Sequence, residues 1–215
     1  MNTQSATSVS SGRSAQTRQK LIDAGVELFS EFGYDATSTR RVEAHAGVQR
    51  NLITYHFGSK PEFWKACMTV LFARVDGPAR TAISHSRDIE PKERMRFLIR
   101  RFVRWSAAHP EVARVMFDEG RHDDWRLEWL VDNYARRLYE TVTRQFEEGR
   151  KQGVVPDLSA TQFYYVLVSS AGIFGMAPEC RRLSGEDPCE SAFVDLHADA
   201  VAQLLTSSPE QRHRS

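Results

Sequence analysis

The sequence lacks the features that mark several large classes of protein. Its 215 residues contain three cysteines, Cys67, Cys180 and Cys189, without any short paired spacing, so neither a disulfide framework nor a zinc ribbon is expected. No set of His, Cys and carboxylate residues has metal-ligand spacing, and no phosphate-binding loop is present. No stretch approaches the roughly 18 to 20 apolar residues of a membrane span, and the polar N-terminus lacks an apolar signal core. We therefore expect a cytoplasmic protein with no metal, no cofactor and no membrane partner.

An excess of charge of one sign is also missing. The sequence has 29 Lys and Arg against 28 Asp and Glu, a net charge of +1. Any affinity for nucleic acid must therefore come from the local placement of basic residues. The hydrophobic fraction of 41% is that of an ordinary globular protein, which excludes disorder of the whole chain.

Strand alternation and repeats of fixed period are absent, whereas helical periodicity begins at Thr17 and recurs to Leu205. We predict an all-α protein. Residues 1–16 hold five serines and one charged side chain, so we expect a disordered arm there. A domain of short helices over 17–60, a larger helical domain over 61–206 and a polar tail over 207–215 should follow.

Start and stop signals divide the helical region. Gly33 ends the first helix, Ser59 with Pro61 and Glu62 begins a long one, and Ser159 with Gln162 forms a capping box. A break is expected at Gly77-Pro78 and a polar loop over 177–190. The expected helices span about 17–32, 37–46, 49–57, 59–76, 91–109, 123–152, 163–176 and 191–205, with a restart at Pro110.

The second and third short helices are joined through Ala46-Gly47-Val48, which gives the length and turn chemistry of a helix-turn-helix. Glycine turns also join short helices in many bundles that bind nothing. The spacing alone therefore leaves a purely structural role open.

The residues themselves are more specific. The stretch from Thr17 to Trp64, 48 of the 215 residues, resembles the N-terminal domain of TetR-family transcriptional regulators. The matching motifs are Thr17-Arg18, Leu21-Ile22-Asp23-Ala24, Leu28-Phe29, Gly33-Tyr34, Thr37-Ser38-Thr39, Ala46-Gly47-Val48, Tyr55-His56-Phe57 and Lys60. The resemblance implies an all-helical subunit with a helix-turn-helix domain over 17–60 and an effector-binding and dimerisation domain over 61–206.

Three positions depart from the family pattern. Glu43 stands where Ala is most frequent, Gln49 where a small N-cap serine is common, and Thr54 replaces the first aromatic residue before Tyr-His-Phe. These departures bear on which operator is read, and not on whether DNA is bound.

The second helix of a helix-turn-helix enters the major groove, where each base pair presents a distinct pattern of donors and acceptors. Here that helix is predicted over 49–57, with Ile53 and Phe57 facing the core. Five residues are expected to face the bases: Gln49, Arg50, Asn51, Leu52 and Thr54. Arg50 suits guanine, Asn51 or Gln49 suits adenine, and Leu52 suits a thymine methyl. For each, a contact to phosphate or water alone is the alternative.

Phosphate contacts are expected on both sides of this helix. Thr39, at the N-terminus of the preceding helix, can present its hydroxyl and backbone N–H, and Arg40 and Arg41 can add charge. The resemblance implies the same role for Tyr55, His56 and Lys60. His45 is expected to be a surface residue of the helix.

The resemblance implies that the last two long helices pair with those of a second copy. A two-fold dimer reads two half-sites about one helical turn apart or a multiple of it, so we predict a homodimer on an inverted-repeat operator in double-stranded DNA. Small residues over 169–172 would permit close approach of helices, within the subunit or between subunits.

Aromatic and sulfur side chains in the larger domain form the candidate pocket for a small effector. They are Phe102, Trp105, Met116, Phe117, Trp125, Trp129, Tyr164 and Phe174, with Tyr134 and Tyr165 nearby in sequence. Such residues at helical spacing are more often plain core, which is the alternative. His109 and His122 can orient a polar group of the effector or be structural, and Cys180 and Cys189 can remain reduced or form a redox pair.

The sequence thus predicts a DNA-binding transcriptional regulator, specifically a repressor released by an apolar or aromatic effector. One alternative is an activator or a DNA binder without an effector, which a small molecule's influence on operator affinity distinguishes. The other is an all-helical enzyme, which would turn over a bound compound. No Ser/His/Asp, Cys/His or paired-carboxylate arrangement supports it.

Overall fold

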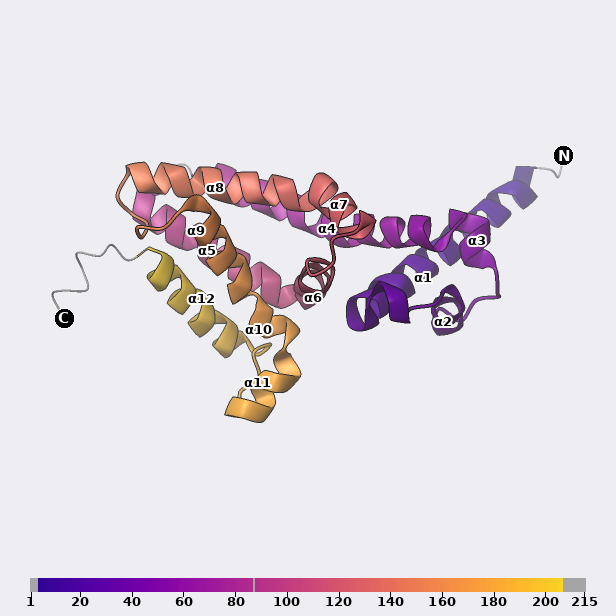
Figure 1. The fold of residues 1–215 in the computed structure, drawn as a ribbon. Helices are drawn as coiled ribbons and strands as arrows, with labels where there is room; N and C mark the ends of the chain where they lie inside the picture. The colour runs from indigo at the N-terminus through magenta and orange to yellow at the C-terminus, as the bar shows by residue number, and fades with distance from the viewer. Residues whose placement is uncertain (1–3, 87, 207–215) are drawn as a thin grey trace. The chain divides into compact units, whose positions relative to one another are not determined.

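The computed structural model describes residues 4–86 and 88–206, and within these residues every regular element is a helix. This confirms the predicted all-α class. The chain forms two compact units, residues 1–74 and 75–215, and each is described by itself (Figure 1). The predicted tail over 207–215 lies outside the described residues.

The first unit contains α1 (Gln4–Ala36), α2 (Thr39–His45), α3 (Leu52–Phe57) and the beginning of α4 (Lys60–His85). The backbone leaves the helical path at Gly33, with φ 75° and ψ 173°, where glycine alone is unstrained. Because α1 begins at Gln4, residues 4–16 are helical in the structure, whereas the sequence predicted a disordered arm over 1–16. Lengthening an existing helix requires no new nucleus, so low apolar content is a weaker argument against helix here than in an isolated segment.

The core of the first unit includes the start of α4. Phe63, Trp64 and Cys67 are almost completely buried. At Gly25 of α1, a Cβ atom would stand 2.5 Å from both the Cys67 sulfur and the Phe63 ring, so only glycine lets these two helices approach so closely. The compact unit that contains this core extends to residue 74, inside α4, while the end of the helix-turn-helix domain at residue 60 stays a prediction.

The predicted break at Gly77-Pro78 does not occur. The helix α4 continues through these residues to His85. A proline inside a helix removes one backbone hydrogen bond and bends the axis, but its φ is compatible with helix. The local signal therefore does not mark the end of the helix.

The second unit consists of the remaining helices, and their predicted start and stop signals largely hold. The elements are α5 (Pro91–Ala108), α6 (Pro110–Glu119), α7 (Trp125–Leu130), the π-helical turn η1 (Val131–Ala135), α8 (Arg136–Lys151), α9 (Ala160–Ser170), α10 (Gly172–Gly175), α11 (Ala177–Ser184) and α12 (Ser191–Leu205). Pro91 opens α5, and Ser159 and Gln162 form the predicted capping box of α9. The predicted loop over 177–190 contains α11, with Pro178 in its first turn and Gly185 left-handed at its end. The prediction was wrong there because the helix is short and mostly polar.

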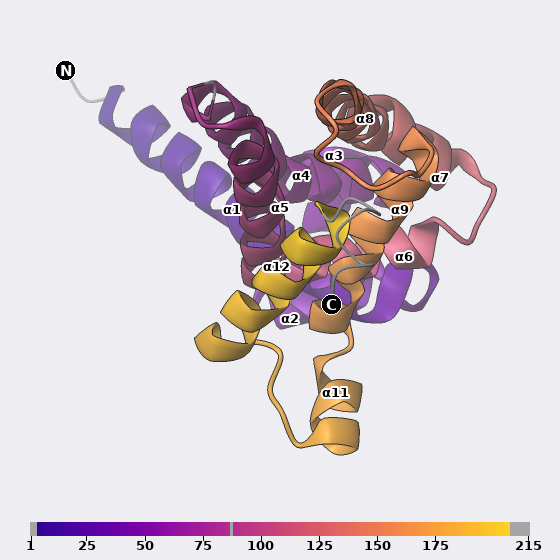
Figure 2. The same cartoon turned by 90° about the vertical axis from the view of Figure 1, so that its left-hand side faces the viewer.

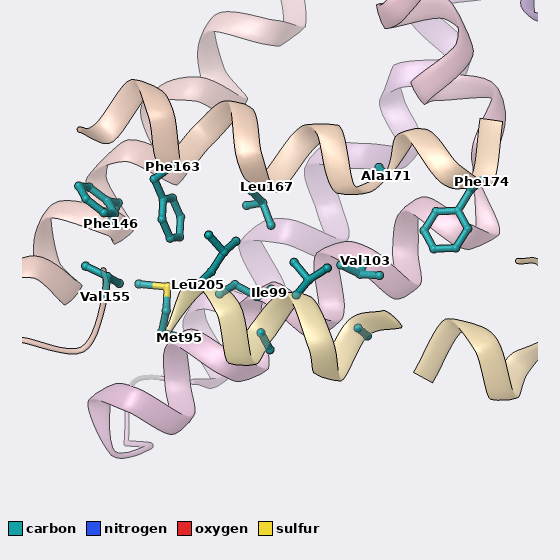
Figure 3. Packing of buried hydrophobic residues seen from close by; sticks show 13 residues of the cluster. Met95, Ile99, Val103, Phe146, Val155, Phe163, Leu167, Ala171, Phe174 and Leu205 are labelled. Atoms are coloured by element: carbon teal, nitrogen blue, oxygen red, sulfur yellow. The ribbon is translucent and has the colours of Figure 1, made fainter. Parts of the chain in front are cut away.

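A cluster of buried side chains, mainly from α5, α8, α9, α10 and α12, forms a core of the second unit, and Figure 3 shows its packing. Ile99 and Val103 of α5 lie beside α12 and α9, and the Met95 side chain extends toward Val155 and the Phe146 ring. The ring centroids of Phe146 and Phe163 lie 4.7 Å apart. Figure 2 shows α12 running alongside α5 and α9. The remaining buried members are Val155, Leu167, Ala171, Phe174, Ala198, Val201, Ala202 and Leu205.

Over residues 4–86 and 88–206, no helix is both long and apolar enough to cross a membrane. In the same residues, no three His, Cys, Asp or Glu side chains gather as metal ligands would.

Candidate nucleic-acid interface

The N-terminus of α2 is fixed by three consecutive hydroxyl residues. Thr37 is buried and its hydroxyl donates to the Leu28 carbonyl at 3.1 Å, which ties the chain to α1. The Ser38 hydroxyl accepts from the Arg41 N–H at 3.2 Å as the N-cap. Thr39 is then the first helical residue and is partly exposed, as the sequence predicted.

The turn between α2 and α3 is longer than predicted. Gly47 has φ 64°, and Asn51 has φ 67° and ψ 9°, a left-handed conformation that ends or precedes a right-handed helix. The helix α3 therefore begins at Leu52, whereas the sequence placed its start at Gln49. Gln49, Arg50 and Asn51 are exposed, but they lie in the turn that leads into the helix and not on the helix itself.

The two faces of α3 follow the prediction with two refinements. Ile53 is fully buried, and Thr54 is exposed. Phe57 is only partly buried, and its ring contacts Phe63 at 4.9 Å between ring centroids. Leu52 is also partly buried, so it presents less of its side chain to a base than the prediction assumed.

The phosphate candidates that follow differ in exposure. Tyr55 is 77% exposed, and its ring meets the partly buried His56 ring edge-on at 4.9 Å. The Lys60 ammonium lies 4.1 Å from the centre of the Tyr34 ring, and the Arg41 guanidinium 3.8 Å from that of Phe32. These cation–π contacts hold both cations near the ends of the helix-turn-helix.

Charge is distributed unevenly over this segment. Residues 36–61 contain four cationic side chains, Arg40, Arg41, Arg50 and Lys60, and one acid, Glu43. Glu43 is 5% exposed, so the accessible surface of the segment carries cations and no carboxylate. A protein of almost zero net charge thus has a locally positive face suited to phosphates.

Sequence reasoning missed two contacts that organise this face. The Glu43 carboxylate accepts from the backbone N–H of Ile53 at 3.0 Å, and the Arg18 guanidinium lies 4.9 Å from the centre of the Phe57 ring. Glu43 departs from the family pattern, but a hydrogen-bond partner ten positions away follows no local motif. His45, predicted to be a surface residue, is exposed and contacts the Glu27 carboxylate at 3.0 Å.

The candidate effector residues differ widely in their surroundings. Phe174 is 2% exposed within the core, and Phe102 packs against that core. Phe117 and Trp125 are 45% and 38% exposed. The others are partly buried and include Trp105, Met116, Trp129 and Tyr164.

The ring contacts of these candidates are local. Trp105 stacks on His109 at 4.6 Å, and Trp129 meets Tyr134 edge-on at 5.5 Å. Tyr164 meets Tyr139 edge-on at 5.0 Å, and its burial raises the pKa of its hydroxyl to about 12. Tyr164 is therefore a neutral hydrogen-bonding group at any physiological pH.

Two short helices joined by a glycine turn, with no accessible carboxylate over residues 36–61, have the geometry and charge that suit a helix-turn-helix. The family model described as "Bacterial regulatory proteins, tetR family" matches residues 21–67, and "Tetracyclin repressor-like, C-terminal domain" matches residues 91–204. The chain therefore belongs to the TetR family of transcriptional regulators, a family of DNA-binding proteins and not of enzymes.

Relatives along most of the chain carry regulatory names. The HTH-type transcriptional repressor SCO4008 of Streptomyces coelicolor is 26% identical over 88% of this chain and 95% of its own length. The HTH-type transcriptional repressor Rv1474c of Mycobacterium tuberculosis is 27% identical over 90% and 97%. Among solved structures, the hemolysin II transcriptional regulator HlyIIR has a TM-score of 0.64 and 20% identity, covering 90% of this chain and 99% of its own. This last likeness shows the shared fold.

Proposed function

We propose that this TetR-family regulator is a homodimeric repressor. It binds an inverted-repeat operator and leaves it when a small, largely apolar or aromatic molecule binds the second unit. The observation that carries the proposal is the accessible surface over residues 36–61, where the one acid is buried. The repressor sign is supported by the two relatives, both named repressors, that match nearly along their whole length. We place the protein in the cytoplasm, where bacterial DNA is bound.

Base readout is assigned to the turn and the first residues of α3. Gln49, Arg50 and Asn51 project from the turn, and Leu52 and Thr54 follow on the helix. A guanidinium can bind guanine bidentately, and an amide can do the same with adenine. Phosphate contacts are assigned to Thr39, Arg40, Tyr55, His56 and Lys60, which flank this turn on both sides.

Selection of binding sites from random duplex DNA tests the proposal, with the affinity of the selected duplex measured at two salt concentrations. Recovery of a palindrome bound by dimers, with affinity that falls steeply as salt rises, is the expected result. Absence of any enriched sequence would contradict it. The same duplex then serves as the probe for small molecules, since an effector-independent binder would show no release.

Arg50→Ala and Lys60→Ala are expected to weaken binding in different ways. Arg50→Ala removes a bidentate base contact, which should cost about 1 to 3 kcal/mol on the selected duplex and relax the preference at one base pair. Binding to the random duplex should change less, because that contact is not made there. Loss of the Lys60 charge should weaken selected and random duplexes alike and flatten the salt dependence. Titrations of both variants on both duplexes check this, and equal losses for Arg50→Ala would remove it from base readout.

The dimer is supported by exposed apolar side chains on the last two long helices. Leu196 and Leu204 of α12 are 72% and 63% exposed, and Tyr165 and Val166 of the adjacent α9 are 60% and 50% exposed. The spacing of four between Leu196, Ala200 and Leu204 makes one stripe along α12. A stripe of this kind on two packed helices suits burial against a second copy.

The effector site is supported by one unsatisfied donor. The Trp105 indole N–H is buried and has no hydrogen-bond partner among the described residues. A buried donor left unpaired costs about 1 to 3 kcal/mol, so a ligand acceptor placed there would gain a contact without competing against an existing one. Trp105 stacks on His109, so a second flat ring lies against the indole that carries the donor.

Trp105→Phe is expected to keep the fold and lose effector sensitivity. The substitution removes an unpaired donor, so its cost in the free energy of unfolding should be below about 1 kcal/mol and smaller than that of Trp64→Phe in the first core. The compound that releases wild-type protein from the selected duplex should be needed at about tenfold higher concentration. Thermal unfolding and duplex release check both parts, and unchanged release would show that Trp105 does not contact the effector.

A further inference from the structure

The N-terminus of α3 has no side-chain cap from its own N-cap residue. The helix has six residues, and the first four N–H groups of any α-helix lack an intrahelical acceptor. Ordinarily the N-cap side chain supplies one. Here the N-cap residue is Asn51, which is left-handed and makes no side-chain cap hydrogen bond. The acceptor must come from elsewhere in the fold.

Glu43 of α2 supplies that acceptor. Its carboxylate oxygen lies 3.0 Å from the Ile53 nitrogen, and Ile53 is the second residue of α3. A carboxylate at this place is favoured twice, because the hydrogen bond is charge-assisted and the helix N-terminus carries partial positive charge. The side chain is 5% exposed, so the cap lies beneath the turn and away from the surface that a duplex would meet.

Glu43 also holds the other end of the turn. Its backbone carbonyl accepts from the Val48 N–H at 3.1 Å. One residue therefore binds the chain at position 48 through its backbone and at position 53 through its side chain. The residues between these two points include Gln49, Arg50 and Asn51, the candidate base readers.

We propose that Glu43 is a positioning residue that caps α3 and thereby fixes the base-reading turn, so that it determines sequence discrimination without touching DNA. This inference rests on the proposed function, because it assigns base readout to residues 49–51. The phosphate candidates Thr39 and Lys60 lie outside the segment that Glu43 holds, so loss of the cap should harm discrimination more than overall affinity.

Three variants separate this role from charge and from folding. Glu43→Ala removes the acceptor. Glu43→Gln keeps an oxygen of the same reach. Glu31→Ala, an exposed acid of α1, removes the same charge from the same unit and leaves the cap intact. The duplex selected by the wild-type protein and a random duplex of equal length are the probes.

On the selected duplex, Glu43→Ala is expected to bind about tenfold more weakly than Glu31→Ala. On the random duplex, the affinities of the two variants should agree within about twofold. Glu43→Gln should stay within about threefold of wild type on the selected duplex, because its amide oxygen can accept from Ile53. Equal losses of Glu43→Ala on the two duplexes would overturn the proposal.

Amide hydrogen exchange, measured by NMR on the DNA-free full-length protein, tests the cap directly. The Ile53 N–H should exchange at least about tenfold faster in Glu43→Ala than in wild type. The N–H of Ala46, the C-cap of α2, which donates to the Val42 carbonyl at 2.8 Å, should not exchange faster. Unchanged Ile53 exchange would overturn the proposal even if DNA binding fell. Failure of the wild-type protein to select any palindrome would instead contradict the proposed function, and the exchange experiment would still test the cap.

Discussion

Joint replacement of Leu196 and Leu204 by Glu is expected to convert the proposed dimer to monomers and to weaken operator binding by about a hundredfold or more. Both leucines lie on the outer stripe of α12, and two carboxylates buried against a second copy would have no partner there. A dimer binds its second half-site as an intramolecular step, which raises affinity by about 10² to 10⁴ over one half-site alone. Monomers lose that gain while each helix-turn-helix is unchanged.

Analytical ultracentrifugation and titration of the selected duplex measure the two parts of this prediction. Leu183→Glu is the matched control, because Leu183 of α11 is 81% exposed but lies outside the proposed interface. It should leave both the mass and the affinity unchanged. The double variant should keep its helical circular dichroism, since neither leucine belongs to the core. A double variant that is still dimeric would place the interface elsewhere.

The local parts of the fold were predictable because their causes are local. Ser38 and Ser159 cap helices, Gly33 leaves the helical path, and Pro91 opens α5. Each of these residues acts on the helix end at which it stands, so the signal and its effect are adjacent in the sequence. The same reasoning failed for the start of α3. There the left-handed Asn51 places the first helical residue at Leu52. The acceptor for the Ile53 N–H is Glu43, ten residues earlier in the sequence. Such a contact depends on how α2 and α3 pack against each other, and hydrophobic periodicity carries no information about that packing.

The extent of the first core and the surroundings of the candidate effector residues were harder to predict, for a similar reason. The sequence ended the domain at a helix start, but Phe63 and Cys67 of α4 complete the core around Gly25. Periodicity locates aromatic residues on a helix without showing whether they fill a core or line a pocket. Phe174 proved to be core, whereas the unpaired donor of Trp105 is a property of the folded chain and has no sequence signal.

The second unit contains a buried ion pair whose disruption should be among the most damaging single changes. The Arg126 guanidinium, on a residue 6% exposed, lies 2.7 Å from the carboxylate of Glu119, which is 3% exposed, and 2.8 Å from that of Asp124. Arg126→Met would leave the Glu119 carboxylate buried and unpaired. Removal of one partner of such a pair costs about 3 to 5 kcal/mol, whereas Arg121→Met, which breaks an exposed pair with Asp118, should cost less than about 1 kcal/mol.

The pH dependence of this loss identifies its cause. Burial raises the pKa of the Glu119 carboxyl above its ordinary value, and the Arg126 guanidinium partly offsets that rise. Without Arg126 the folded-state pKa rises further. A carboxyl whose pKa is raised by folding favours the folded state below its unfolded pKa, and that contribution is lost as pH rises through the folded value. The penalty of Arg126→Met should therefore be smaller near pH 5 than near pH 7.5.

Denaturant unfolding of wild type, Arg126→Met and the double variant Glu119→Gln with Arg126→Met, at both pH values, checks this expectation. The double variant carries no buried carboxylate at position 119, so it should lose most of the pH dependence and recover part of the stability. A penalty for Arg126→Met that is equal at the two pH values would mean that lost packing of the long arginine side chain, and not the unpaired charge of Glu119, causes the destabilisation.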